Sequence, residues 1–154
     1  RYPRGGGVLV DWRCQFEEIK VGTGRKLRDG DNVAVLSIGP IGNLALQAAE
    51  QCQCAMYDMR FLKPIDEAIL QEVARKFKRI VTVENGVRNG GLGSAVLEWM
   101  SDHGYHPEIV RLGLPDTEFV EHGTVPELQQ IVGLDVKSIK KAITHHPSPN
   151  TQRP

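Results

Sequence analysis

Residues 79–100 constrain the fold of this chain more than any other stretch. They begin with the β-branched run 80–83, which is typical of a buried strand. A turn rich in glycine and asparagine follows, and then a helical pattern with one apolar face, formed by Ala95, Val96, Trp99 and Met100. A strand, a glycine loop and a helix in this order either bind a phosphate through backbone N–H groups or make a tight turn.

The glycines of this loop depart from the motif that binds dinucleotides. That motif needs G-x-G-x-x-G and an acidic residue about 20 residues further on. Here Gly91 and Gly93 are followed by Val96 at the third position, and Asp116 lies in a proline-containing loop. The sequence also has no G-x-x-x-x-G-K-[ST] phosphate loop. We therefore predict that the glycines pack the start of a helix against the sheet, with nucleotide binding at Gly90 to Gly93 as the alternative.

Apolar strand patterns alternate with amphipathic helix patterns along most of the chain. The strand patterns cover 21–25, 33–38, 54–59, 80–83 and 109–112, and the helix patterns cover 41–51, 66–78, the stretch after Gly93, 125–132 and 136–143. This order predicts an α/β domain with a mainly parallel sheet and right-handed crossovers. Capping signals mark three helix starts, at Asp66, at Asp135, and at Thr124 with Glu127 three residues later.

Composition narrows the class of protein. The chain has 154 residues, of which 40% are hydrophobic and 25% are charged, as expected for one globular domain. Its 19 basic and 19 acidic side chains balance, so we do not expect nucleic acid as a partner. No apolar run approaches the roughly 20 residues of a membrane span, and we expect no membrane partner.

The cysteines and histidines do not predict a metal site. Cys14, Cys52 and Cys54 are odd in number and lack a second ligand pair nearby in sequence, which favours reduced thiols in the cytoplasm over a disulfide framework or a zinc site. His103 and His106 flank a glycine at a helix end, which is a poor setting for a rigid metal pair. We also find no set of residues that predicts nucleophilic catalysis.

Charged residues follow two of the predicted strands, at the edge where α/β proteins usually bind ligands. Glu84 is a candidate functional carboxylate, although capping of the turn or pairing with Arg88 is the favoured interpretation. Asp58 and Arg60 are expected to pair with each other or across an interface.

Arg1 and Arg4 flank Tyr2 and Pro3 directly before three consecutive glycines. A guanidinium held by a proline-stiffened backbone suits bidentate recognition of phosphate or carboxylate, and a solvated arginine is the alternative. Because the first residue is not an initiator methionine, we expect the chain to be a piece of a larger protein.

Several stretches together resemble the C-terminal domain of the 1-deoxy-D-xylulose-5-phosphate synthase family, in the transketolase superfamily. They follow the family's order and nearly its spacing over residues 1–143: Arg-Tyr-Pro-Arg-Gly at 1–5, Tyr-Asp-Met-Arg-Phe-Leu-Lys-Pro-Ile-Asp at 57–66, Val-Thr-Val-Glu-Asn at 81–85, Gly-Gly-Leu-Gly-Ser at 90–94 and Gly-Leu-Pro-Asp at 113–116. The resemblance implies a three-layer α/β/α domain with a five-stranded mixed, mainly parallel sheet. The connector 8–20 has no match that we can place.

The resemblance also implies an activity. The family condenses pyruvate with D-glyceraldehyde 3-phosphate, releases CO2, and supplies precursors of isoprenoids, thiamine and pyridoxal. It uses thiamine diphosphate and Mg2+, held by the upstream domains, and works as a homodimer. In this chain the resemblance assigns Arg4 to the phosphate of the aldehyde substrate and assigns no catalytic, cofactor-binding or metal-binding residue. The isolated chain is then expected to be inactive.

These inferences divide the chain into three parts. Residues 1–20 are expected to be an interdomain linker with the end of a preceding domain, residues 21–143 a transketolase C-terminal-like domain, and residues 144–154 a disordered tail. The rival within the same fold is the C-terminal domain of another thiamine-diphosphate enzyme, such as a transketolase or the β subunit of a 2-oxo acid dehydrogenase. The Arg-Tyr-Pro-Arg and Asp-Met-Arg-Phe motifs favour the synthase family.

Overall fold

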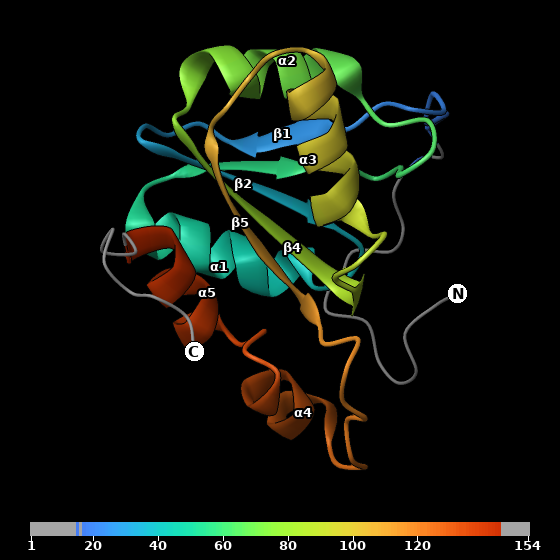
Figure 1. Ribbon diagram of the computed structural model, residues 1–154, viewed down its shortest axis with the longest axis vertical. Coiled ribbons are helices and arrows are strands. Elements are labelled where there is room, and N and C mark those ends of the chain that lie inside the picture. The colour runs from blue at the N-terminus through green and yellow to red at the C-terminus, as the bar shows by residue number, and fades with distance from the viewer. Residues whose placement is uncertain (1–14, 16, 146–154) are drawn as a thin grey trace.

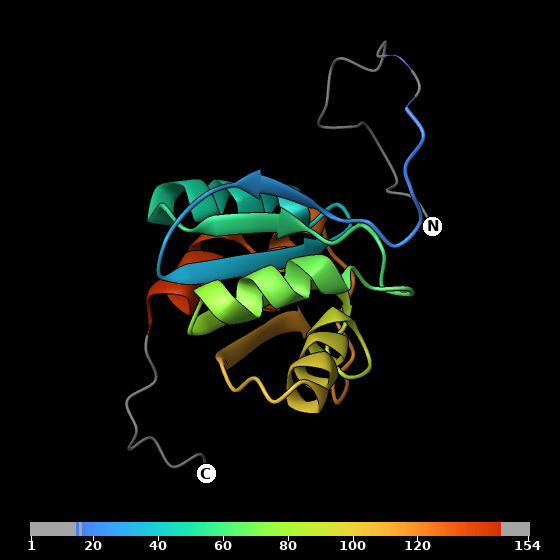
Figure 2. The same ribbon diagram turned by 90° about the horizontal axis from the view of Figure 1, so that it is seen from above.

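The computed structural model describes residue 15 and residues 17–145, which form a sheet with helices on both faces (Figure 1, Figure 2). The strands are β1 (Arg25–Arg28), β2 (Val33–Ile38), β3 (Ala55–Asp58), β4 (Arg79–Val87) and β5 (Glu108–Leu114). The helices are α1 (Gly42–Cys52), α2 (Glu67–Lys76), α3 (Leu92–Asp102), α4 (Val125–Ile131) and α5 (Val136–Thr144). None of these helices is both long enough and apolar enough to span a bilayer, as far as the described residues go.

The five strands lie in the order β1-β3-β2-β4-β5. The pairs β3·β2, β2·β4 and β4·β5 are parallel, and β1 pairs antiparallel with β3 at one edge. This mixed, mainly parallel sheet between two helical layers confirms the predicted fold class. The chain runs from β2 outward to β3 and then returns to β4 on the other side of β2, so the loops that follow β2 and β4 diverge at the carboxyl edge of the sheet.

Alternate side chains of the inner strands fill two separate cores. Val35, Val81 and Val83 pack with α1 and α5 on one face of the sheet, whereas Leu36 and Ile80 pack with α2 and α3 on the other. Because these strands are covered on both sides, β2 is buried along nearly its whole length. This double coverage explains why its sequence is a continuous apolar run rather than an alternating one.

The predicted helix starts are confirmed. Asp66 accepts a hydrogen bond from the backbone N–H three residues later at 3.1 Å, and Asp135 does the same at 3.1 Å. Thr124 and Glu127 form the predicted capping box of α4. In each case a side-chain oxygen satisfies an N–H group that has no partner within the helix.

The first strand lies later in the chain than its pattern predicted. The prediction was a short strand and turn over 21–25, whereas β1 begins at Arg25. Gly22 has a φ of 79°, and the N–H of Gly24 donates to Asp66 at 2.8 Å, so the predicted strand is a turn held against the start of α2. The left-handed backbone at Gly22 ends any extended run before β1.

Arg79 joins the amino ends of β4 and β5 to the end of α5. Its guanidinium is buried, with Nη1 2.6 Å from a carboxylate oxygen of Glu108. Its Nη2 donates to two carbonyl oxygens at the end of α5, at 2.8 and 2.6 Å. The helix includes Thr144, one residue into the predicted tail, and residues 146–154 lie outside the described residues.

Candidate functional site at the carboxyl edge of the sheet

A groove of about 800 Å³ lies at the carboxyl edge of the sheet. Its walls are the end of β2 with the loop 39–41, and the end of β4 with residues 89–91 of the following loop. Leu62 and, from α4, Val125 and Gln129 complete the lining. In α/β proteins, ligands bind where the strand order reverses, which is between β2 and β4 here. The groove is therefore the candidate site, and its chemistry depends on the polar groups at its walls.

Glu84 is a charged side chain that links the end of β4 to the start of α3 at this site. It is buried, with 4% of its surface exposed, although it carries a carboxylate. Its Oε2 accepts a hydrogen bond from the N–H of Leu92 at 2.9 Å, and its Oε1 accepts one from the N–H of Gly93 at 3.0 Å. Of the two favoured interpretations, capping of the turn or pairing with Arg88, the structure confirms capping, because the carboxylate of Glu84 accepts both hydrogen bonds at the start of α3.

The close approach of this carboxylate explains the glycines. A Cβ on Gly91 would lie 1.9 Å from Oε2 of Glu84. A Cβ on Gly93 would lie 2.7 Å from the hydroxyl of Thr82 and 2.7 Å from the side chain of Arg111. Both positions therefore need glycine because there is no room for a side chain. The predicted packing role of the loop is confirmed.

The N–H groups at the two helix starts beside the groove, those of α1 and α3, are already used within the domain. Two in the first turn of α3 donate to Glu84. At the start of α1, those of Gly42, Asn43 and Leu44 donate to backbone carbonyl oxygens three residues earlier. A phosphate placed at the start of α3 would meet a carboxylate instead of free donors, and this like-charge contact is unfavourable. The groove thus suits a neutral or apolar occupant better than an anion.

Asp58 and Arg60 interact within the domain, as one of the two predicted alternatives stated. The N–H of Arg60 donates to Oδ1 of Asp58 at 3.2 Å, and its Nε lies 4.0 Å from Oδ2. Arg25 on β1 also donates to Oδ2 of Asp58 at 3.2 Å. Arg25 could not be identified from the sequence, because the antiparallel pairing that brings it to Asp58 joins residues 33 positions apart.

His103 and the two described cysteines have structural settings. Nδ1 of His103 lies 2.8 Å from the carbonyl oxygen of Trp99, and the two rings stack at 4.1 Å. Cys52 and Cys54 are free thiols, and burial raises the pKa of Cys54 to about 11, which keeps it protonated at neutral pH. Cys14 lies outside the described residues. In the described part of the chain no three His, Cys, Asp or Glu side chains are grouped to hold a metal ion.

Arg4 also lies outside the described residues, with most of the predicted linker 1–20. The structure therefore does not place the guanidinium that was predicted to bind the substrate's phosphate. The role of Arg4 in binding this phosphate stays a prediction.

The fold is an α/β domain in which Glu84, at the carboxyl edge of the sheet, accepts hydrogen bonds from the helix start that follows the glycine loop. The chain belongs to the transketolase C-terminal domain family, because the family model described as "Transketolase, C-terminal domain" matches residues 22–139. This assignment agrees with the superfamily that the sequence motifs indicated.

Within this family, the chain is similar to proteins of one name. The chain is 55% identical over 150 residues to the 1-deoxy-D-xylulose-5-phosphate synthase of Bacteroides fragilis, a match that covers 94% of this chain and 23% of that protein. It is 40% identical over 146 residues to the synthase of the same name from Vibrio vulnificus, covering 95% of this chain and 23% of that protein. The chain thus spans about a quarter of the length of these relatives.

A solved structure has the same fold. It is a split-gene transketolase, described as an inactive β4 tetramer, and it superposes with a TM-score of 0.76 at 32% sequence identity. The match covers 82% of this chain and 43% of that one.

Proposed function

We propose that this chain is the C-terminal domain of a 1-deoxy-D-xylulose-5-phosphate synthase. The reaction joins the two-carbon unit of pyruvate to D-glyceraldehyde 3-phosphate, and the carboxylate of pyruvate leaves as CO2. The observation that carries this proposal is the identity of 55% to a synthase of that name over 94% of this chain. The split-gene transketolase, at 32% identity, makes transketolase chemistry the second candidate.

The proposed enzyme needs thiamine diphosphate and Mg2+, and the described residues do not fit either group. The carboxylate of Glu84 occupies the helix start that would otherwise meet a diphosphate. The described residues also lack a cluster of metal ligands. We therefore assign the cofactor and the metal ion to the remainder of the enzyme.

Three further features belong to the proposal. The enzyme is a cytoplasmic homodimer, this domain contacts the upstream domains, and the 154-residue chain alone is inactive. The solved split-gene transketolase supports the last point, because it is described as inactive in its β4 tetramer.

Arg4 is the one residue of this chain that we assign to the substrate. In the whole enzyme, Arg4→Ala is expected to raise the KM for D-glyceraldehyde 3-phosphate about 10-fold or more, because a charge-assisted contact with the phosphate is lost. The KM for pyruvate should change little. Arg4→Lys, which keeps the charge but not the two-pronged geometry, should give an intermediate KM. An equal rise for both substrates would remove Arg4 from this role.

Steady-state assays of the whole enzyme with thiamine diphosphate and Mg2+ test the function itself. Formation of 1-deoxy-D-xylulose 5-phosphate from pyruvate and the aldehyde is expected. Transfer of a ketol unit between sugar phosphates, without use of pyruvate, would instead select the second candidate. Clear turnover by the 154-residue chain alone would show that the catalytic groups have been misplaced.

A further inference from the structure

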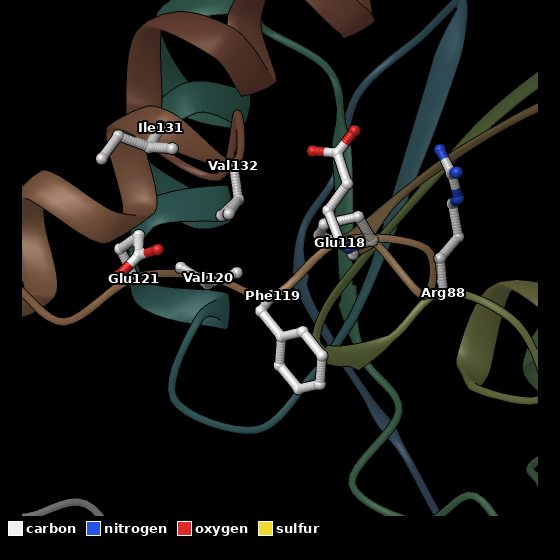
Figure 3. A pocket seen from close by; sticks show the side chains of 9 residues that line it. Arg88, Glu118, Phe119, Val120, Glu121, Ile131 and Val132 are labelled. Carbon is white, nitrogen blue, oxygen red and sulfur yellow. The ribbon is translucent and has the colours of Figure 1, made fainter.

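Large apolar side chains are exposed on and beside α4. Phe119 is fully exposed, Ile131 is 73% exposed and Val125 is 64% exposed. Val120, next to Phe119, is also exposed. Figure 3 shows the ring of Phe119 projecting from its loop on the side opposite to Glu118. We call these four residues, Phe119, Val120, Val125 and Ile131, the α4 surface.

The helix itself indicates that the α4 surface needs a partner. α4 has seven residues and buries none of them. Val125, Leu128 and Ile131 recur every three positions, which gives the helix one apolar stripe. Such a short helix is not stable by propensity alone and depends on packing of its apolar face. In Figure 1, α4 lies at the end of the molecule, away from the two helical layers.

Hollows flank α4 on two sides. The groove described above reaches Val125 of this helix. A second hollow of about 350 Å³ is lined by Phe119, Val120 and Ile131 together with Arg88 and other residues (Figure 3). The α4 surface and the two hollows therefore form one uneven, largely apolar face at the carboxyl edge of the sheet. A face of this kind marks an interaction site.

The polypeptide that precedes the domain arrives at this same edge. Arg25, the first residue of β1, pairs with Asp58, the last residue of β3, so β1 starts at the carboxyl edge. Ile19 and Val21, directly before β1, are exposed apolar residues as well. The matched synthases extend well beyond this chain, which covers 23% of their length. The missing part of such an enzyme would thus be tethered at the carboxyl edge of the sheet, the edge that also carries the α4 surface.

Charge argues against a second copy as the occupant. Residues 113–133 contain four acidic side chains and no lysine or arginine, although the whole chain is neutral: Asp116, Glu118, Glu121 and Glu127. Two copies of this surface would bring like charges together across a desolvated contact, which is unfavourable. A complementary partner has an apolar recess with a basic rim.

We propose that the α4 surface is the docking face for the upstream polypeptide of the same enzyme, with Phe119 as its central anchor. The inference rests on the proposed function insofar as that function places this chain at the end of a longer synthase. It adds the surface, the anchor and the chemistry of the contact. An exposed aromatic ring that enters a recess is the typical energetic centre of an interface.

Hydroxyl-radical footprinting tests the proposal, because it measures the solvent exposure of individual side chains. The rates of oxidation are compared between the whole enzyme and the 154-residue chain. Phe119 and Ile131 are expected to react about tenfold more slowly in the whole enzyme, as interface anchors do when they become buried. Leu97, an exposed leucine on α3, is the internal control and should react equally in both. Equal rates for Phe119 in both proteins would overturn the proposal.

A matched pair of variants locates the contact. Phe119→Asp in the whole enzyme should return the oxidation rate of Ile131 to that of the isolated chain, whereas Leu97→Asp should leave it slow. Unchanged protection of Ile131 in Phe119→Asp would overturn the role of the anchor. If Phe119 and Ile131 were oxidised more slowly as the concentration of the isolated chain rises, the α4 surface would bind a second copy, and the proposal would be wrong. Because synthase turnover is a separate readout, protection without turnover would refute the proposed function and leave the docking face standing.

Discussion

α4 and α5 follow each other in the chain and begin alike, but they differ in what they bury. Each starts with a side-chain cap, a capping box at Thr124 and Glu127 for α4 and Asp135 for α5. α5 places Ile139 and Ile143 in the core beside α1, whereas α4 buries no residue. The comparison shows that a well-formed helix start does not fix a helix to the domain; a buried face does.

The largest expected effect is on the buried face of α5. Ile139→Ala should lower the free energy of unfolding of the isolated chain by about 3 kcal/mol, because it leaves a cavity in a fully buried position. Ile131→Ala, the matched change in α4, should cost less than about 0.5 kcal/mol, because that side chain is mostly exposed. Urea unfolding of both variants measures the difference. Similar losses of stability would mean that α4 is packed after all.

The second effect concerns the anchor at the end of α5. Arg79→Met should lower the free energy of unfolding by about 2 kcal/mol. The variant loses charged hydrogen bonds to two carbonyl oxygens at the end of α5 and an ion pair with Glu108. Lys78→Met, at an exposed position directly before β4, serves as the control and should change the free energy of unfolding very little. Thermal unfolding of the two variants gives the comparison. A neutral Arg79→Met would show that α5 is held by its apolar face alone.

The third effect depends on pH. Hydrogen bonds from Ser138, first of all from its side chain, hold the pKa of Asp135 below its ordinary value. Because the folded-state pKa is lowered, this stabilisation is present above the unfolded value of about 4 and is lost as the pH falls through the folded value. Asp135→Ala should lower the free energy of unfolding by about 1 kcal/mol at pH 7, and by progressively less as the pH falls.

Asp135→Asn is the control for that titration, since asparagine caps a helix without a titrating proton. Its unfolding free energy should stay near that of the parent chain at pH 7 and show a weaker fall in acid. If Asp135→Ala were equally costly at pH 7 and well below pH 4, the charged cap would not be the source of the pH dependence.

The smallest effect is expected in α4. Hydrogen bonds from the side chain and the backbone of Thr124 lower the pKa of Glu127, as the capping box requires. Even so, Glu127→Gln should leave the unfolding midpoint of the isolated chain unchanged, because α4 contributes no buried face to the domain. Circular dichroism during unfolding measures this. A clear drop in the midpoint would contradict the contrast between the two helices.

Features with a local cause could be predicted from the sequence. Asp66 and Asp135 form caps through bonds to residues three positions ahead, and such signals survive in any fold. The strand at 33–38 was predicted within its observed bounds, because burial on both faces demands a continuous apolar run. The missing third glycine also indicated, correctly, that the loop at 90–93 packs a helix.

Features that depend on distant residues could not be predicted. Arg79 reaches carbonyl oxygens 63 and 66 positions away, and no pattern in the sequence marks that pairing. Nor could the exposure of Val125 and Ile131 be foreseen, because a stripe spaced every three positions is the same for a core helix and for an unpartnered one. Whether such a stripe is covered depends on residues outside the helix.

Hydrogen exchange of α4 against α5 tests the central claim most directly. In the isolated chain, the amides of α5 should exchange only on global unfolding, whereas those of α4 should exchange by local opening and much faster. In the whole enzyme, the amides of α4 should exchange much more slowly than in the isolated chain. The amides of α5 should still exchange only on global unfolding. Slow exchange of α4 already in the isolated chain, or fast exchange of α4 in both proteins, would contradict the account.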